Sequence, residues 1–415
     1  MPRLQRHLGY TIASAGLLLI GALTLLPTPG EAERAAATPL TCIICGDLGG
    51  VDFLLNILLF VPLGLGLALA GFSWRRAVVL AVITTCIIEL LQMKVITGRD
   101  ASLGDILANT IGSGLGVLLA SYWRGIVLPS PRTARLLALL DAVILVGVWT
   151  GTAWGLGVSI PQGGRWFGAL SPELGNFEQF RGRALSGTAG GEPLLPGAVL
   201  DQHRIEDAFN ARPQLAFRAV LATPPPGLAP IAILIDDWHG IVSLIGQEHE
   251  DLVFGVQMRA SILRLRNPTA VLPGGLAGHT GDTVAAEGTL QNGAFELRSR
   301  NGNHLLSRTI PLSASWGWSL VTPWNSRYDE YTRPLTTVWI LGLVAVLAYW
   351  ATLAGGIGWT ILPVTIAAML AAVPYAAGLP PSHWSEWVAA VAGITLGSVV
   401  AMTARRAIAQ AEAAE

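Results

Sequence analysis

The sequence predicts an α-helical polytopic membrane bundle of about eight transmembrane helices with an inserted, extracytoplasmic, all-β sandwich. Of its 415 residues, 52% are hydrophobic and only 13% are charged, whereas about 25% of an average soluble domain is charged. Apolar runs of membrane length flank one long polar stretch in which apolar and polar residues alternate. The net charge of −1 argues against a nucleic-acid partner.

Eight apolar runs are long enough to cross a membrane, since a spanning helix needs roughly 20 mostly apolar residues. Pro363 and Pro374 interrupt the seventh of them. The first run also fits a signal peptide with a cleavage region at 30–37, but its apolar core is longer than usual, so a retained helix is predicted. The runs cover residues 8–26, 53–71, 77–93, 103–121, 136–156, 336–354, 358–378 and 386–403.

Basic residues gather in alternate loops, which sets the direction of the helices. Because Lys and Arg favour the cytoplasmic side, both termini are predicted in the cytoplasm and residues 157–334 outside it. The residues that share this side are Arg3, Arg6, Arg75, Arg76, Arg124, Arg132, Arg135, Arg405 and Arg406.

Three domains follow from the change in patterning: 1–156 with five helices, 157–334 as the sandwich and 335–415 with three helices. Inside the sandwich, Asn301-Gly302-Asn303 carries the Asn-Gly signal of a hairpin turn. Strands are predicted within 214–223, 231–247, 251–260 and 293–310, the second of these segments holding two strands that turn at 236–240.

The segments 232–259 and 312–324 resemble those of concanavalin A-like and laminin-G-like sandwiches. The resemblance implies a glycan or protein partner, in some members held through calcium. Two interpretations of the acidic turn residues stay open: oxygen ligands for a hard cation or solvated turn residues. These residues are Asp236, Asp237, Glu250 and Asp251. No metal site and no cofactor is predicted. Three tryptophans before the sixth span, Trp316, Trp318 and Trp324, are predicted to be anchors at the membrane interface.

Polar side chains collect at one predicted membrane depth. They are Asn56 in the second span, Glu89 and Gln92 in the third, and Asp105 and Asn109 in the fourth, with Arg99 in the loop above. Residues three or four apart share a helix face. Gly112 and Gly116 continue the face of Asp105 and allow a neighbouring helix to approach closely.

Ionisable groups inside a membrane mark functional sites by default. In that interpretation Glu89 and Asp105 are candidate catalytic residues for proton transfer. Arg99 would bind an anionic headgroup, and Asn56, Gln92 and Asn109 would orient the substrate or the acids. In the alternative interpretation the same groups only join helices through hydrogen bonds, at about 0.6 kcal/mol each.

The blocks 56–69, 87–92, Arg99 and 105–116 together resemble the VanZ-like family, whose pattern also includes Pro62, Gly64 and Gly112. The resemblance covers about residues 10–121. It implies a multi-pass protein of the bacterial cytoplasmic membrane, and the founding member is linked to resistance against the glycopeptide antibiotic teicoplanin. No reaction is implied, so whether the chain is an enzyme stays open.

Two functions are therefore predicted as alternatives. The protein acts on or binds an anionic, lipid-linked cell-wall component, or it is a non-catalytic tether that displays the sandwich, 157–334, to a glycan or a protein. A transporter fits less well, because the polar residues gather at one leaflet rather than at mid-membrane.

Two further features have alternative interpretations. Glu386, Gly393 and Gly397 repeat the spacing of Asp105, Gly112 and Gly116, with Ala390 where Asn109 stands; an internal repeat and chance explain this equally well. Cys42 and Cys45 form either a small disulfide or half of a metal site.

Overall fold

The computed structural model describes most of the chain and shows eight helices long and apolar enough to cross a membrane. The predicted cleavage region at 30–37, the turn residues Trp238 and His239, and Trp324 lie outside the described residues. The described residues are 2–27, 39–99, 101–161, 164–175, 177–198, 202–237, 240–322, 327–328 and 331–413.

The eight predicted spans are confirmed, each within a few residues of its predicted limits. The seventh span consists of α10, a π-helical turn at Ala368–Ala372 and α11. The π turn fits the sequence, because Pro374 lacks the N–H that a regular helix would pair with the carbonyl four residues earlier. The helices are α1 (Pro2–Thr24), α3 (Gly49–Leu69), α4 (Trp74–Lys94), α5 (Leu103–Val127), α6 (Pro131–Gly155), α9 (Thr332–Ala354), α10 (Gly358–Ala367), α11 (Val373–Ala376) and α12 (Trp384–Ala413).

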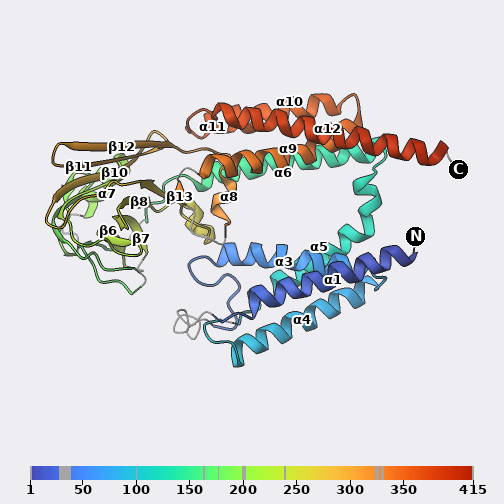
Figure 1. Cartoon of the computed structure of the whole chain (residues 1–415), viewed down its shortest axis with the longest axis horizontal. Coiled ribbons are helices and arrows are strands. Elements are labelled where there is room, and N and C mark those ends of the chain that lie inside the picture. Colours follow the sequence, from blue (N-terminus) through green and yellow to red (C-terminus); the bar gives the residue numbers. More distant parts are fainter. Residues whose placement is uncertain are drawn as a thin grey trace.

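The helices form two groups that lie side by side (Figure 1). In the first group α3 packs between α1 and α5, and α4 packs on α5. In the second group α9 packs between α6 and α12. Both chain termini lie at one end of the bundle, and the sandwich lies at the other (Figure 1).

The inserted region contains two sheets that face each other across an apolar core, as predicted for a sandwich. Within the described residues the strand orders are β13-β9-β8-β7-β6-β1-β4 and β12-β11-β10-β5-β2-β3, and only β13 and β9 pair in parallel. The strands are β1 (Trp166–Leu170), β2 (Arg183–Ala189), β3 (Glu192–Pro193), β4 (Gly197–Ala198), β5 (Gln214–Val220), β6 (Ala229–Asp236), β7 (Ile241–Glu248), β8 (Asp251–Val256), β9 (Thr269–Leu272), β10 (Thr283–Gln291), β11 (Ala294–Asn301), β12 (His304–Pro311) and β13 (Arg327–Tyr328).

Alternation along β5 and β11 places one face of the six-stranded sheet in the core, whereas β6, β7 and β8 of the other sheet are buried along almost their whole length. Phe254 from one sheet meets Phe295 from the other edge-to-face, with ring centroids 5.9 Å apart. The hairpin predicted at Asn301 is confirmed, since Asn301 pairs with His304 and Gly302 has φ +56°. One helix that the alternation did not predict, α7 (Gln202–Ala211), adds Phe209 to the core beside Trp166.

The tryptophans before α9 pack inside the protein, so the prediction of membrane-interface anchors is wrong for the two that are described. Trp316 is 6% exposed and lies on Tyr328, and Trp318 is 8% exposed. The indole N–H of Trp318 donates to the Thr336 hydroxyl at 3.1 Å. Both rings fill the junction between sandwich and helices, where burial outweighs a position in the headgroup region.

The sandwich also touches the first helix group. The backbone N–H of Gly50, at the start of α3, donates to the carbonyl of Arg264 at 3.2 Å. The guanidinium of Arg264 donates to the carbonyl of Gly46 at 2.8 Å. These contacts place the sandwich directly beside the helix ends that carry the predicted polar set.

Candidate functional site

Glycines bring α3 and α5 into backbone contact. A Cβ on Gly112 would lie 2.1 Å from the Ile57 carbonyl oxygen, and a Cβ on Gly116 would lie 2.2 Å from that of Val61. Real atoms never approach so closely, so only glycine permits this helix separation. The contact places Asn56 of α3 opposite Asp105 of α5.

Asp105 is the centre of the polar set. Its Oδ1 accepts a 2.5 Å hydrogen bond from the Asn56 side-chain amide, and its Oδ2 accepts a 2.7 Å bond from the Ser102 hydroxyl. The backbone N–H of Asp105 donates back to Ser102 Oγ at 3.1 Å. Ser102 is therefore the N-cap of α5, and the same hydroxyl that starts the helix also holds the carboxylate.

Glu89 joins this set through the same serine. Its carboxylate is 6% exposed, and Oε2 accepts the backbone N–H of Ser102 at 2.9 Å. Glu89, Asp105 and Asn56 thus come from α4, α5 and α3 and meet around one residue. We call these three residues with Ser102 the Ser102 cluster. It lies near the sandwich-side ends of the three helices. The sequence had predicted that Asn56, Glu89 and Asp105 lie at one common depth.

Arg99 and Gln92 point to the end of α1. Arg99 donates from Nε to the Leu26 carbonyl at 3.2 Å and from Nη2 to the Leu23 carbonyl at 3.0 Å. The Gln92 amide donates to the Thr24 carbonyl at 3.0 Å. A cation at a helix C-terminus is favourable because the last carbonyls carry partial negative charge. Within the described part of the chain Arg99 forms no ion pair with Glu89 or Asp105.

Asn109 lies one helical turn deeper than Asp105 and is separate from the Ser102 cluster. It is 2% exposed, and its amide donates to the Thr85 hydroxyl at 2.8 Å. Its Oδ1 is buried with no hydrogen-bond partner. The structure therefore distributes the six predicted residues over three places: the cluster, the end of α1 and the α4–α5 contact.

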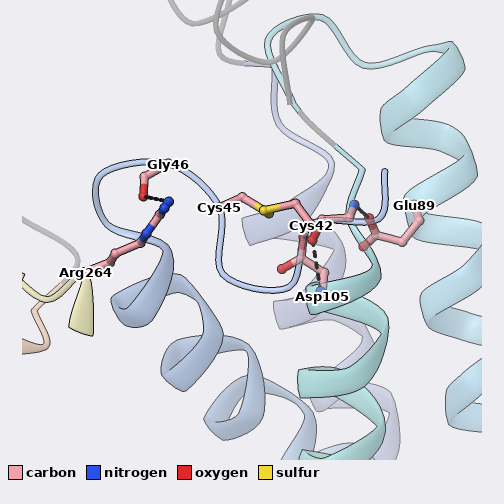
Figure 2. Close-up of a disulfide and its surroundings, with 7 residues drawn as sticks. Cys42, Cys45, Gly46, Glu89, Asp105 and Arg264 are labelled. Atoms are coloured by element: carbon pink, nitrogen blue, oxygen red, sulfur yellow. Dashed lines mark hydrogen bonds between the residues drawn. A yellow bond between two sulfur atoms is a disulfide. The ribbon is translucent and has the colours of Figure 1, made fainter. Parts of the chain in front are cut away.

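A disulfide loop covers the start of α5 (Figure 2). Cys42 and Cys45 are bonded to each other, which resolves the two interpretations in favour of a disulfide. The carbonyls of Leu40 and Cys42 accept the N–H groups of Leu103 and Gly104 at 2.9 and 3.1 Å. Gly46, next to the disulfide, is the residue that accepts from Arg264. The loop thus connects the Ser102 cluster to the sandwich (Figure 2).

Ser102 and the disulfide loop are parts of this arrangement that the sequence did not assign to it. Ser102 carries a recognisable signal, because Ser-x-x-Asp before an apolar run is an N-capping pattern. The position of Cys42 over the α5 start carries no such signal, since it depends on how the loop folds back. Thr85, the partner of Asn109, lies four residues before Glu89 and so shares its helix face, which is a signal that the sequence does carry.

The second helix group repeats the glycine contact of the first. A Cβ on Gly393 would lie 2.7 Å from the Leu341 carbonyl oxygen, and a Cβ on Gly397 would lie 2.1 Å from that of Ala345. The α12–α9 contact therefore has the same construction as the α5–α3 contact. This supports the internal repeat over chance similarity.

The acid of the second group has different partners. Glu386, in the first turn of α12, is 5% exposed and accepts from the hydroxyls of Ser313 at 2.9 Å and Ser315 at 2.7 Å. Ser315 in turn accepts the Trp149 indole N–H at 3.2 Å. Both serines come from the end of the inserted region, so Glu386 fastens the sandwich to α12 and α6 and does not extend the Ser102 cluster.

The acidic turn residues of the sandwich bind backbone N–H groups. Asp236 accepts from Gly240 at 2.7 Å, and Asp251 accepts from Gly274 at 2.8 Å. Asp237 accepts from the Arg165 N–H at 2.6 Å. Among the described residues, no group of three or more His, Cys, Asp or Glu is arranged to hold a metal ion. These contacts favour the interpretation as turn residues.

The fold and the site define a class: a multi-pass membrane protein whose helices hold a partly buried polar cluster beside a large β-sandwich. Residues 16–124 match the sequence model of the VanZ/LLP1 family. The match runs from within α1 to near the end of α5 and contains all the motif residues from Asn56 to Gly112. No curated protein and no solved structure matches the chain.

Proposed function

We propose that this VanZ-like protein binds an anionic, membrane-embedded component of the bacterial envelope, such as a lipid-linked cell-wall precursor, and contributes to glycopeptide-type antibiotic resistance. The observation that carries the proposal is the Ser102 cluster. Three helices bring Asn56, Glu89 and Asp105 together around one serine, with Glu89 buried and Asp105 half-buried. Ionisable groups held within membrane-spanning helices mark functional sites by default.

The residues take distinct roles in this proposal. Arg99 uses two of its five N–H donors on the end of α1, and the others are the anion-binding group of the site. Glu89 accepts from the backbone N–H of Ser102 and Asp105 accepts from its hydroxyl, so the two candidate residues for proton transfer lie around one serine. Asn56 fixes the Asp105 carboxylate, while Gln92 and Asn109 hold the surrounding helices in place.

The proposal places the sandwich and the Ser102 cluster on the outer side of the bacterial cytoplasmic membrane, with both termini in the cytoplasm. Two independent observations support this orientation. The termini lie at the bundle end away from the sandwich (Figure 1), and basic residues flank the helices there. The Cys42–Cys45 disulfide lies on the sandwich side, and disulfides persist in oxidising compartments.

The function is tested by near-isosteric changes of the acids. Glu89→Gln and Asp105→Asn are each expected to abolish a glycopeptide-resistance or envelope phenotype while membrane abundance stays within about twofold of the unchanged protein, because hydrogen bonding survives but the charge does not. Arg99→Ala is expected to do the same. The phenotype is measured as antibiotic susceptibility of cells that depend on this chain, with abundance from immunoblots.

Glu250→Gln is the matched control, since Glu250 is exposed on the sandwich away from the cluster. It should leave both readouts unchanged. Loss of abundance in all three variants would instead indicate that these residues only hold helices together.

A second function is favoured by the Glu386 contacts. In it the bundle is a non-catalytic tether, and the sandwich, as a concanavalin A-like or laminin-G-like module, binds a glycan or a protein. The carboxylate that fastens the sandwich to α12 and α6 would keep the module rigid above the membrane. An unchanged resistance or envelope phenotype in cells that carry Glu89→Gln or Asp105→Asn would favour this function over the first.

A further inference from the structure

The outer face of the six-stranded sheet carries a groove of about 550 Å³. It crosses β2, β5, β10, β11 and β12, and its floor includes the small residues Ala216 and Ala285, with Glu287 two residues from Ala285 on β10. The outer face of a sheet normally carries longer polar side chains. Small residues in neighbouring strands instead leave a hollow between the larger side chains at its margins.

Strand register places two arginines on either side of this floor. Ala285 pairs with Arg218 on one neighbouring strand and with Arg300 on the other. The backbones of the two arginines are therefore two strand spacings apart, about 10 Å. Ser186 and Leu305 continue the same row to its two ends.

The two arginines are not neutralised by the protein. In the part of the chain that the structure describes, no carboxylate lies within ion-pair distance of Arg218 or Arg300, and both side chains are exposed. The third arginine of the groove differs, because Arg298 lies 3.5 Å from Glu287 and 3.4 Å from Glu296. The groove thus has two free cationic groups at a fixed separation.

Hydroxyl groups line the margins beside these charges. Ser186 and Thr188 come from β2 on one side, and Ser307 comes from β12 on the other. Donors and acceptors at this density suit a ligand that is rich in hydroxyl groups.

A peptide fits the groove less well than a glycan. The floor lies on β5 and β10, which pair with neighbours on both sides, so the floor offers no free edge for an added strand; the edge strand β12 lies at the margin of the groove. The small floor also offers no deep apolar pocket for an anchoring side chain.

We propose that the outer face of the six-stranded sheet binds an extended anionic glycan or polyol polymer, with Arg218 and Arg300 each holding one of its carboxylate or phosphate groups. The inference deepens the proposed binding role of the sandwich. It depends on the proposed outward placement of the sandwich in one respect only: that placement decides whether the polymer comes from outside the cell. Binding is measured on the purified chain and so does not depend on orientation.

The test is titration of the full chain in detergent micelles with four probes of similar length: hexagalacturonate, a glycerol-phosphate hexamer, neutral maltohexaose and hexaglutamate peptide. At least one of the first two should bind, and which of them binds identifies the source of the anion. Maltohexaose and hexaglutamate should bind at least tenfold more weakly. Arg218→Ala and Arg300→Ala should each weaken binding of the preferred probe about tenfold, because each removes a charge-assisted hydrogen bond.

Arg212→Ala is the matched control, since Arg212 is exposed on the same domain but outside the groove. It should change the affinity by less than about twofold. The proposal is overturned if neither anionic polyol binds, if maltohexaose or hexaglutamate binds as well as they do, or if the Arg218 and Arg300 variants bind like the unchanged chain.

Discussion

Alanine at Gly112 or Gly116 is expected to lower the free energy of unfolding of the α1–α5 helix group by about 1–3 kcal/mol. The added Cβ would lie 2.1–2.2 Å from a carbonyl oxygen of α3, so α3 and α5 must separate, and forcing extra atoms into a packed contact costs typically 1–3 kcal/mol. Separation also lengthens the Asn56–Asp105 hydrogen bond, which spans the same two helices. The measurement is thermal or denaturant unfolding in detergent micelles.

Gly114 provides the matched control on the same helix. A Cβ there meets no atom within 4 Å, and alanine is a better helix former than glycine by up to about 1 kcal/mol. Gly114→Ala should therefore be neutral or slightly stabilising. Equal effects of all three changes would mean that α3 and α5 are not in backbone contact. The account also predicts a loss for Gly397→Ala in α12, because its Cβ would meet the Ala345 carbonyl.

Replacing Glu386 by alanine is expected to lower the free energy of unfolding by about 3 kcal/mol. The change leaves the Ser313 and Ser315 hydroxyls buried without their acceptor, and each unsatisfied buried group costs about 1–3 kcal/mol. It also releases the sandwich from α12, so proteolysis and hydrogen exchange within residues 312–322 should rise. These two measurements separate uncoupling from general unfolding.

Two variants accompany this experiment. Glu386→Gln should retain most of the stability, because its amide oxygen still accepts from one serine and its NH₂ can donate to the other. Thr395→Ala, on an exposed position of the same helix, should have no measurable effect. Unchanged protection of 312–322 in Glu386→Ala would show that other contacts hold the sandwich in place.

The sequence predicted the helices well because lipid leaves the chain few choices. Backbone groups in a bilayer must be satisfied within a helix or a closed barrel, so an apolar run of about 20 residues indicates a helix almost by itself. The sandwich was predictable from the alternation of apolar and polar residues and from the hairpin at Asn301. Helix α7 was missed because its first residues are polar and resemble a loop.

The site was only partly predictable. The spacing of Gly112 and Gly116 predicted the close approach of a neighbouring helix, but the structure was needed to show that this helix is α3. The Asn56–Asp105 bond follows from that contact. The partners of Arg99 did not follow, because the end of α1 is distant in sequence and its carbonyls carry no side-chain signal. The repeat in α12 was obscured since Ala390 replaces the asparagine, whereas the glycine contact depends only on Gly393 and Gly397.

The most direct test of the central claim, that the Ser102 cluster and the sandwich share the outer side of the membrane, is labelling of single cysteines in intact cells with an impermeant maleimide. The background carries serine at Cys42, Cys45 and Cys86. We predict that Thr97→Cys, in the exposed loop between α4 and α5, and Thr280→Cys, in an exposed turn of the sandwich, react from outside. Arg75→Cys, in the first turn of α4, should react only after the membrane is permeabilised. Reaction of Arg75→Cys in intact cells, with protection of the other two, would contradict the account.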